Sequence, residues 1–206
     1  DAGPDYALWE ALLNRILTEC PDHCLVVTRL LATHSLSRVR AECRIRPLLP
    51  CKPMLAKPTK ELSAILSRLE GRAFTCEYKY DGLRGQAHTD GHTLRIFSRN
   101  LDDLSPAYPE LRAPLLALAA GRSLILDGEI VAWDRAAGRV LPFQLLTARA
   151  KKHAEGAAPA SSAAEVCFFL FDVLLLDGHS LLPLSLAARR TALRALVGPG
   201  SPAVRL

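Results

Sequence analysis

The chain has 206 residues, of which 50% are hydrophobic and 23% are charged, and its formal net charge is +5. This balance excludes a disordered acidic or basic tail, which would hold fewer apolar residues and a larger net charge. The length allows one or two domains with a buried core. The longest apolar run, residues 166–176, contains Asp172 and is shorter than the roughly 18 residues of a membrane span, so we predict no membrane segment.

The sequence starts at Asp1 without a basic region, an apolar core and a cleavage site, so we predict no secretory signal. The absence of an initiator Met indicates a chain cut from a longer polypeptide. In a chain without an export signal, cysteines stay reduced, so we expect an intracellular protein without disulfides. The cysteine spacings match no zinc site; these residues are Cys20, Cys24, Cys43, Cys51, Cys76 and Cys167.

Positive charge is concentrated in one stretch. Residues 29–60 hold eight basic residues and a single acidic one, Glu42, whereas residues 1–28 hold five acidic residues and one basic residue. Such a stretch suits a polyanion such as DNA, and a solvated surface is the alternative interpretation.

Apolar residues recur at helical spacing over the first 45 residues, which predicts helices, the third of them capped by Ser35 or Ser37. Prolines then punctuate the chain, and we place a domain boundary near residues 46–52. A capped amphipathic helix is predicted over residues 59–69.

Beyond residue 70 the pattern changes to alternation, which predicts an α+β body with mostly antiparallel pairing. Asp90-Gly91 is a strong hairpin signal between two of the strands. Small residues at 154–164 indicate a surface loop. Strands are predicted at 73–80, 84–89, 93–98, 123–134, 139–141 and 166–176, and helices at 109–120 and 185–196.

Glu77 and Lys79 would share one face of the strand predicted at 73–80. One interpretation is a plain ion pair on that face. The other is a nucleophilic lysine, which attacks as the neutral amine and therefore needs positive charge nearby to lower its pKa. Arg84 supplies such a charge, and Gly82 allows close approach of the backbone.

Four segments in order carry a family resemblance. K-Y-D-G-L-R at 79–84, F-S-R-N at 97–100, L-D-G-E-I-V-A-W-D at 126–134 and F-F-L-F-D-V-L-L-L-D-G at 168–178 resemble the motifs of the covalent nucleotidyltransferases. The flanking C-K-P-M-L-A-K-P-T at 51–59 and L-P-F-Q-L-L-T-A-R at 141–149 are similar to the eukaryotic replicative type of ATP-dependent DNA ligase. Residues 5–46 resemble the last helices of that family's DNA-binding domain.

The resemblance implies a fold. We expect an antiparallel-sheet nucleotidyltransferase domain, ATP-grasp-like, over residues 48–206. An α-helical segment, residues 1–47, would precede it as the end of the DNA-binding domain. The two late motifs of the family, one acidic and one with lysine, are missing after Leu182, so we expect an adenylation domain that stops before them.

The resemblance also implies roles for individual residues. Lys79 would attack the α-phosphorus of ATP and hold AMP, and Glu77 would accept a hydrogen bond from the adenine amino group. Arg84 would contact ribose or phosphates, and Arg99 would bind ribose or a DNA phosphate unless it is an ordinary exposed arginine. Glu129 would serve the Mg²⁺ ion.

Other residues in or near these motifs have less specific interpretations. Asp127 shares a strand face with Glu129, and paired carboxylates suit Mg²⁺, but Asp127 is given no firm role. Phe171 would stack on adenine, whereas Phe169 would belong to the core. Trp133 is interpreted as packing. A basic cluster would contact DNA or form a solvated turn: Arg149, Lys151 and Lys152.

The implied activity is sealing of nicks in duplex DNA through lysyl-AMP, with ATP and Mg²⁺, in replication, repair and recombination. The resemblance further implies a nuclear monomer, with sliding-clamp contacts in regions outside this chain. One alternative is a truncated or non-catalytic ligase-like DNA-binding module, which would ligate poorly alone. Another is a capping enzyme or RNA ligase, against which Glu77, the K-P-M-L-A segment and the helical leader argue.

Overall fold

The computed structural model describes residues 6–147, 164–198 and 201–206. Three helices come first: α1 (Tyr6–Glu19), α2 (His23–Thr33) and α3 (Leu36–Glu42). Asp22 caps α2 by accepting from the Leu25 amide at 2.9 Å, and Ser35, not Ser37, caps α3. The three helices enclose an apolar cluster of their own, which consists of Ile16, Cys20, Val26, Leu36, Val39 and Cys43.

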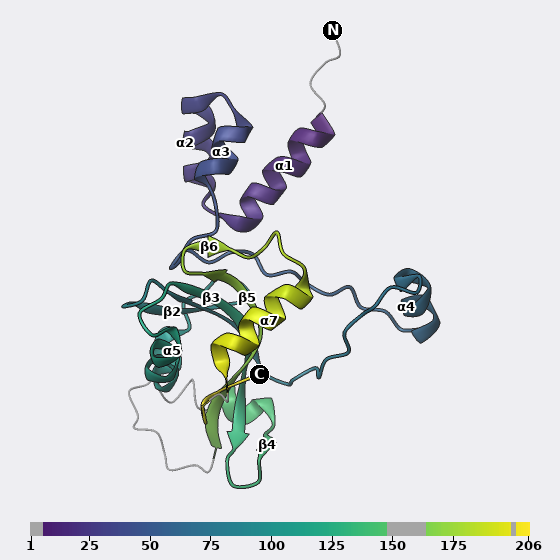
Figure 1. The fold of residues 1–206 in the computed structure, drawn as a ribbon, viewed down its shortest axis with the longest axis vertical. Coiled ribbons are helices and arrows are strands. Elements are labelled where there is room, and N and C mark those ends of the chain that lie inside the picture. Colours follow the sequence, from purple (N-terminus) through teal and green to yellow (C-terminus); the bar gives the residue numbers. More distant parts are fainter. Residues whose placement is uncertain (1–5, 148–163, 199–200) are drawn as a thin grey trace.

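The body is a curled sheet of seven strands in the order β2-β1-β3-β5-β6, with β4 on β3 and β7 on β5 (Figure 1). All pairs are antiparallel except β5 with β7. The predicted α+β class with antiparallel pairing is therefore confirmed. The strands are β1 (Leu83–Thr89), β2 (Leu94–Ser98), β3 (Leu124–Asp134), β4 (Arg139–Val140), β5 (Ala164–Leu176), β6 (His179–Ser180) and β7 (Val204–Arg205).

The predicted hairpin joins β1 to β2. The Asp90 carboxylate accepts from the amides of His92 and Thr93, and Gly91 has a φ of 101°, which only glycine adopts easily. Two helices then cover the main apolar face of the sheet: α5 (Arg112–Ala119), which follows the 3-10 turns η1 (Ser105–Ala107) and η2 (Pro109–Leu111), and α7 (Leu186–Val197). Ser185 caps α7, close to the predicted start.

The two faces of the sheet differ in chemistry. One carries the large core, built from residues such as Leu126, Phe168 and Leu170 together with α5 and α7. The other has two smaller apolar clusters, one around Ile125 and the other around Trp133. Arg84, Asp127 and Glu129 lie between these clusters, because the register places them on the same side. This second face is called the polar face below.

A long segment separates helices α1 to α3, called the leader below, from the sheet. Residues 52–81, called the arm below, lead out to α4 (Leu62–Leu69) and return, and Figure 1 shows α4 standing apart from the sheet. No residue of α4 is buried. The helix begins three residues later than predicted and Glu61 gives it no side-chain cap, so the capped helix from residue 59 is a wrong prediction.

The strand predicted over residues 73–80 is also wrong. The segment joins no ladder of the sheet, although β2 and β6 are edge strands. The six cysteines are free, as expected. The basic cluster at 149–152 and most of the predicted loop at 154–164 lie outside the described residues. Within the described ranges, the helices are too short or too polar to cross a membrane.

Candidate active site on the polar face of the sheet

Arg84 and Asp127 form the buried centre of the polar face. Arg84 Nε and Nη2 donate to the two Asp127 carboxylate oxygens at 3.0 and 2.6 Å, a bidentate arrangement. The side chain of Asp127 is 6% exposed and that of Arg84 is 23% exposed. Burial raises the pKa of Asp127, and the Arg84 guanidinium opposes this effect. Asp127 had no firm role in the sequence interpretation, and its structural role is to hold Arg84.

Arg84 also contacts an aromatic ring and the start of the arm. Its guanidinium carbon lies 5.3 Å from the centre of the Phe171 ring, a cation–π contact. Its Nη1 donates to the Met54 carbonyl at 3.0 Å. The chain is also held at Cys51, just before the arm. Gln86 accepts a hydrogen bond from the Cys51 amide at 3.0 Å and donates one to the Cys51 carbonyl at 3.3 Å. These contacts keep residues 51–54 against the polar face.

Phe171 sits at an irregularity in β5. The register passes from Asp127 opposite Asp172 to Gly128 opposite Leu170, so Phe171 faces no residue of β3. Such a bulge re-aims side chains and increases the local twist. Phe171 remains partly exposed, whereas Phe169 is 7% exposed and packs on the rings of Tyr80 and Trp133 at 4.5 and 5.6 Å. Core packing of Phe169 and Trp133 is thus confirmed.

Glu129 lies next to the returning end of the arm. It is opposite Arg84 in the ladder and makes no hydrogen bond or ion pair with the described residues. Burial raises the pKa of Glu129 to about 7; Arg84 and Lys79 lower it, and Asp127 and Asp81 raise it. Gly82 brings the arm this close, because a Cβ there would lie 2.8 Å from Glu129 Cγ and 2.9 Å from Val131 Cγ1.

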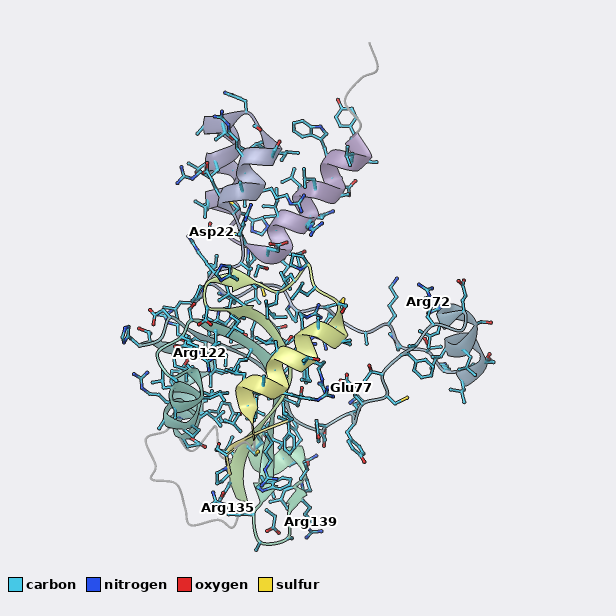
Figure 2. All side chains as sticks on the ribbon, viewed as in Figure 1. Asp22, Arg72, Glu77, Arg122, Arg135 and Arg139 are labelled. Carbon is cyan, nitrogen blue, oxygen red and sulfur yellow. The ribbon has the colours of Figure 1, made fainter. Side chains whose placement is uncertain are left out.

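Glu77 and Lys79 lie on the arm. Lys79 is exposed, and its charge is one of those that lower the pKa of Glu129. Glu77 forms an ion pair with Arg190 of α7 at 3.2 Å, a contact that sequence reasoning missed (Figure 2). The predicted common strand face for Glu77 and Lys79 does not exist, since residues 73–80 form no strand.

Arg99 is separate from this group. It lies in the turn after β2, one residue beyond the pair of Ser98 with Gly85, and is exposed. It makes no hydrogen bond or ion pair in the described parts of the chain. The structure therefore brings together Arg84, Asp127, Glu129 and Phe171, with Lys79 and Glu77 at their border, and leaves Arg99 at the outer strand.

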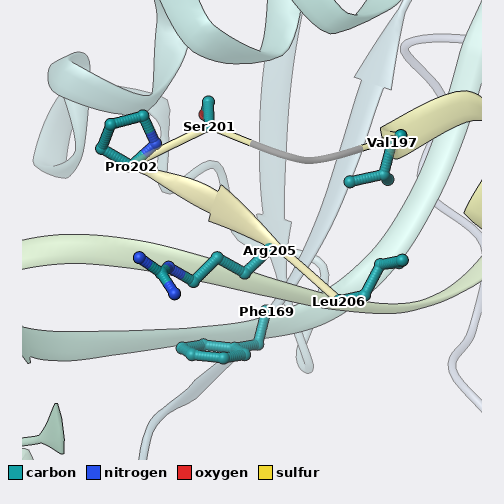
Figure 3. A pocket seen from close by; sticks show the side chains of 7 residues that line it. Phe169, Val197, Ser201, Pro202, Arg205 and Leu206 are labelled. Carbon is teal, nitrogen blue, oxygen red and sulfur yellow. The ribbon is translucent and has the colours of Figure 1, made fainter. Parts of the chain in front are cut away.

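A cavity of about 460 Å³ lies next to Phe169 and Arg205. Figure 3 shows the Phe169 ring beneath the Arg205 side chain of β7. Arg205 also covers the Trp133 ring at 4.7 Å. No three His, Cys, Asp or Glu side chains cluster as a ready cation site within the described ranges. A metal at Glu129 would therefore need oxygen ligands from phosphates and water, the usual situation for Mg²⁺.

Comparisons with known proteins point to one family. A family model described as "ATP dependent DNA ligase domain" matches residues 53–206. DNA ligase 1 of Schizosaccharomyces pombe is 38% identical over 195 residues, and DNA ligase 1 of Saccharomyces cerevisiae is 41% identical over 176 residues. These alignments cover 93% and 84% of this chain, but only 25% and 23% of the relatives. The chain thus spans about a quarter of their length.

Solved structures agree with the family model. The ligase domain of LigD from M. tuberculosis superposes with a TM-score of 0.50 at 32% identity, covering 63% of this chain and 39% of that one. A mycobacterial DNA ligase D, complexed with ATP and MES, gives a TM-score of 0.51 at the same identity, covering 63% of this chain and 38% of that one. The sequence motifs, the curled antiparallel sheet and the family match together show that the chain belongs to the ATP-dependent DNA ligase domain family.

Proposed function

We propose that this chain carries the lysine-adenylation chemistry of an ATP-dependent DNA ligase that seals nicks in duplex DNA. The observation that carries the proposal is the group of Arg84, Glu129 and Phe171 on the polar face, next to the point where Gly82 brings the arm segment of Lys79 against β3. A nucleophile, a carboxylate, a guanidinium and a partly exposed aromatic ring are the groups that adenylation of a lysine requires.

In the proposed reaction, the neutral Lys79 amine forms a bond to the α-phosphorus, pyrophosphate leaves, and the amine loses a proton to solvent. Phe171 offers its ring to the adenine, and the free oxygen of the Glu77 carboxylate accepts from the adenine amino group. Arg84 stays in place through Asp127 and faces the ribose and phosphates. AMP then passes to the 5′-phosphate of a nick, and attack by the 3′-hydroxyl releases it.

Glu129 fits a magnesium ion. It is a half-buried carboxylate without a hydrogen-bond partner in the described chain, and burial disfavours its charged form. A divalent cation held by Glu129 would restore the charge and shield the phosphates from the attacking amine. Arg99, on the outer strand, would contact a DNA phosphate rather than the nucleotide.

Residues 1–47 are proposed to be the C-terminal helices of a DNA-binding domain, and residues 48–206 part of the adenylation domain. The separate apolar cluster of α1 to α3 supports this division. The eight basic residues at 29–60, with Glu42 as the single acidic one, suit a polyanion. Nicked duplex DNA is therefore the proposed partner. Monomeric state, nuclear location and contact with a sliding clamp remain proposals from the family resemblance.

Lys79→Ala should abolish the covalent protein–AMP adduct, because it removes the amine that would bond to the α-phosphorus. The measurement is transfer of label from α-³²P-ATP to protein, using the longest product of the gene. Lys60→Ala, an exposed lysine elsewhere on the arm, is the matched control and should label normally. Undiminished labelling of Lys79→Ala would overturn the assignment, and labelling by GTP in preference to ATP would favour a capping-type enzyme.

A further inference from the structure

Two adjacent arginines of α7 hold the bulge of β5. Arg189 Nε and Nη2 donate to the two carboxylate oxygens of Asp172, each at 2.8 Å. Arg190 Nη1 donates to the Phe171 carbonyl at 2.8 Å. A bulge leaves backbone groups of the extra residue outside the ladder, so Arg190 provides the hydrogen bond that the neighbouring strand does not.

The same nitrogen of Arg190 has a second partner. It lies 3.2 Å from Glu77 Oε1, and the two side chains are 22% and 47% exposed. Glu77 comes from the arm, Phe171 from β5 and Arg190 from α7, and Figure 2 shows Glu77 between the arm and α7. One guanidinium thus joins three elements that are distant in sequence, at the place where Lys79 approaches the sheet.

Residues 73–81 have few other attachments. Within the described chain, none of their backbone amides or carbonyls takes part in a hydrogen bond, and the pair with Arg190 is their one ion pair. Phe74 and Tyr78 are 53% and 87% exposed. At the far end of the segment, Tyr80 packs on Phe169 and Gly82 approaches β3. The charges of Lys79 and Asp81 also act on Glu129 there, without an ion pair. Arg190 is therefore the polar tether of this segment.

We propose that Arg190 is a positioning residue, which fixes the segment of Lys79 against the adenine-binding side of the sheet by bridging the Glu77 carboxylate and the Phe171 carbonyl. Arg190 takes Oε1 and leaves the second oxygen of Glu77 for a ligand. Because it binds both Glu77 and the backbone of Phe171, Arg190 sets the distance between the carboxylate and the ring. The part of this inference that concerns adenine rests on the proposed function.

Cys76 offers a direct readout of the tether. It is exposed and precedes Glu77, and Cys24 is the other exposed cysteine, so a nitroxide can be placed on Cys76 alone in a Cys24→Ser background. In Arg190→Gln, we expect the ratio of immobile to mobile label to fall about 2- to 5-fold, the range for losing a partly exposed ion pair. The measurement is the electron paramagnetic resonance spectrum of the 206-residue chain.

Matched variants separate a tether from general damage. Glu77→Gln breaks the pair from the exposed arm, leaves the sheet intact, and should mobilise the label equally. The double variant should add nothing further, since both changes remove one contact. Arg194→Gln, on the same helix with an exposed guanidinium free of described partners, should leave the spectrum unchanged. An unaltered spectrum in Arg190→Gln, or additive effects in the double variant, would overturn the tether.

A kinetic measurement tests the link to the nucleotide. In the longest product of the gene, Arg190→Gln should raise the KM for ATP in adduct formation about 2- to 5-fold while the limiting rate stays within about twofold. Arg190→Lys should recover part of the KM, because lysine keeps the charge without the planar fork. An unchanged KM would overturn the link to adenine. If the wild-type protein forms no adduct, the proposed function fails, and the label experiment still decides the tether.

Discussion

Arg84 uses one guanidinium for three contacts: the Asp127 carboxylate, the Phe171 ring and the Met54 carbonyl. Its charge is retained in a half-buried place because Asp127 compensates it. The Asp127 carboxylate thus compensates the positive charge of Arg84, which would act on a nucleotide, although Asp127 itself would not contact the nucleotide. The assignment of Arg84 as a nucleotide contact is a proposal, but its rigid orientation is a property of the fold.

Asp127→Ala should destabilise the protein by about 3–5 kcal/mol, because it removes the carboxylate that compensates the largely buried Arg84 charge. The free energy of unfolding in urea is the measurement. Glu165→Ala is the matched control, since it removes the partner of Arg135 in a pair whose side chains are 43% and 57% exposed. The control should cost less than about 1 kcal/mol. Equal losses in the two variants would contradict the buried role of Asp127.

His88 should make stability depend on pH. It is buried, it shares a hydrogen bond of 2.7 Å with Gln86, and burial lowers its pKa to about 3. Between that value and the ordinary pKa near 6.5, the unfolded chain binds the extra proton. The contribution of His88 to stability should therefore fall as pH drops below 6.5, by up to about 1.4 kcal/mol per pH unit. Glu129, whose pKa is raised to about 7, contributes with the opposite sign in this range.

Urea unfolding at several pH values between 7 and 4 measures this slope. His88→Gln should remove the His88 contribution to the slope, whatever its effect on stability at pH 7. His179→Gln, at an exposed position, should keep it. A His88→Gln slope equal to that of the wild type would contradict the prediction.

At the scale of elements, β3 is the strand against which the site is assembled. It carries Asp127 and Glu129 on one face, whereas Gly128 between them turns to the core. A Cβ at Gly128 would lie 2.7 Å from Phe168 Cε2 and 3.1 Å from Leu170 Cα. Glycine is thus required here by close packing against β5, at the register shift that leaves Phe171 without a partner on β3.

Gly128→Ala should cost about 1–3 kcal/mol of stability, as overpacking does, and should disturb the bulge. Thermal and urea unfolding measure the loss. Gly138→Asn is the control, because Gly138 has a φ of 63° with open space around it, a conformation that Asn tolerates. A Gly128→Ala variant as stable as Gly138→Asn would show that β3 and β5 can separate without cost.

The elements that could be predicted from sequence are those with local signals. Asp90-Gly91 predicts the hairpin of β1 and β2, and Ser185 predicts the start of α7, which it caps. The segment at 73–80 has the alternation of a strand, but a strand also needs a partner strand to pair with, and no local sequence pattern records whether one is present. In the candidate site, the motifs point to Glu129 and Phe171, and the roles given to them stay predictions. The pairs Arg84–Asp127 and Arg190–Glu77 could not, because each joins residues distant in sequence.

At the scale of the molecule, the arm differs from everything around it. The leader and the sheet each have a buried cluster, whereas α4 has no buried residue and exposes Leu62, Ile65 and Leu66. Most of the stability should therefore come from the leader and the sheet, and the arm should open at little cost.

Limited trypsin digestion should cut first on the arm, after Lys60, Arg68 or Arg72, all of them exposed. Arg84 and Arg95 serve as internal controls, because both lie in strands of the hairpin. The order of the cuts is read by mass spectrometry over a time course. Cleavage at Arg84 or Arg95 as early as on the arm would contradict the prediction.

The hydrogen bond from Arg84 to the Met54 carbonyl has a consequence for evolution of chain length. Met54 lies near the start of the arm and Arg84 lies just beyond its end, so their hydrogen bond closes residues 55–83 into a single loop. Closure entropy grows only logarithmically, and doubling the loop would cost roughly 0.6 kcal/mol. Insertions and deletions around α4 should therefore be nearly neutral for folding. Selection on the length of this loop would act through the position that the loop gives to Lys79.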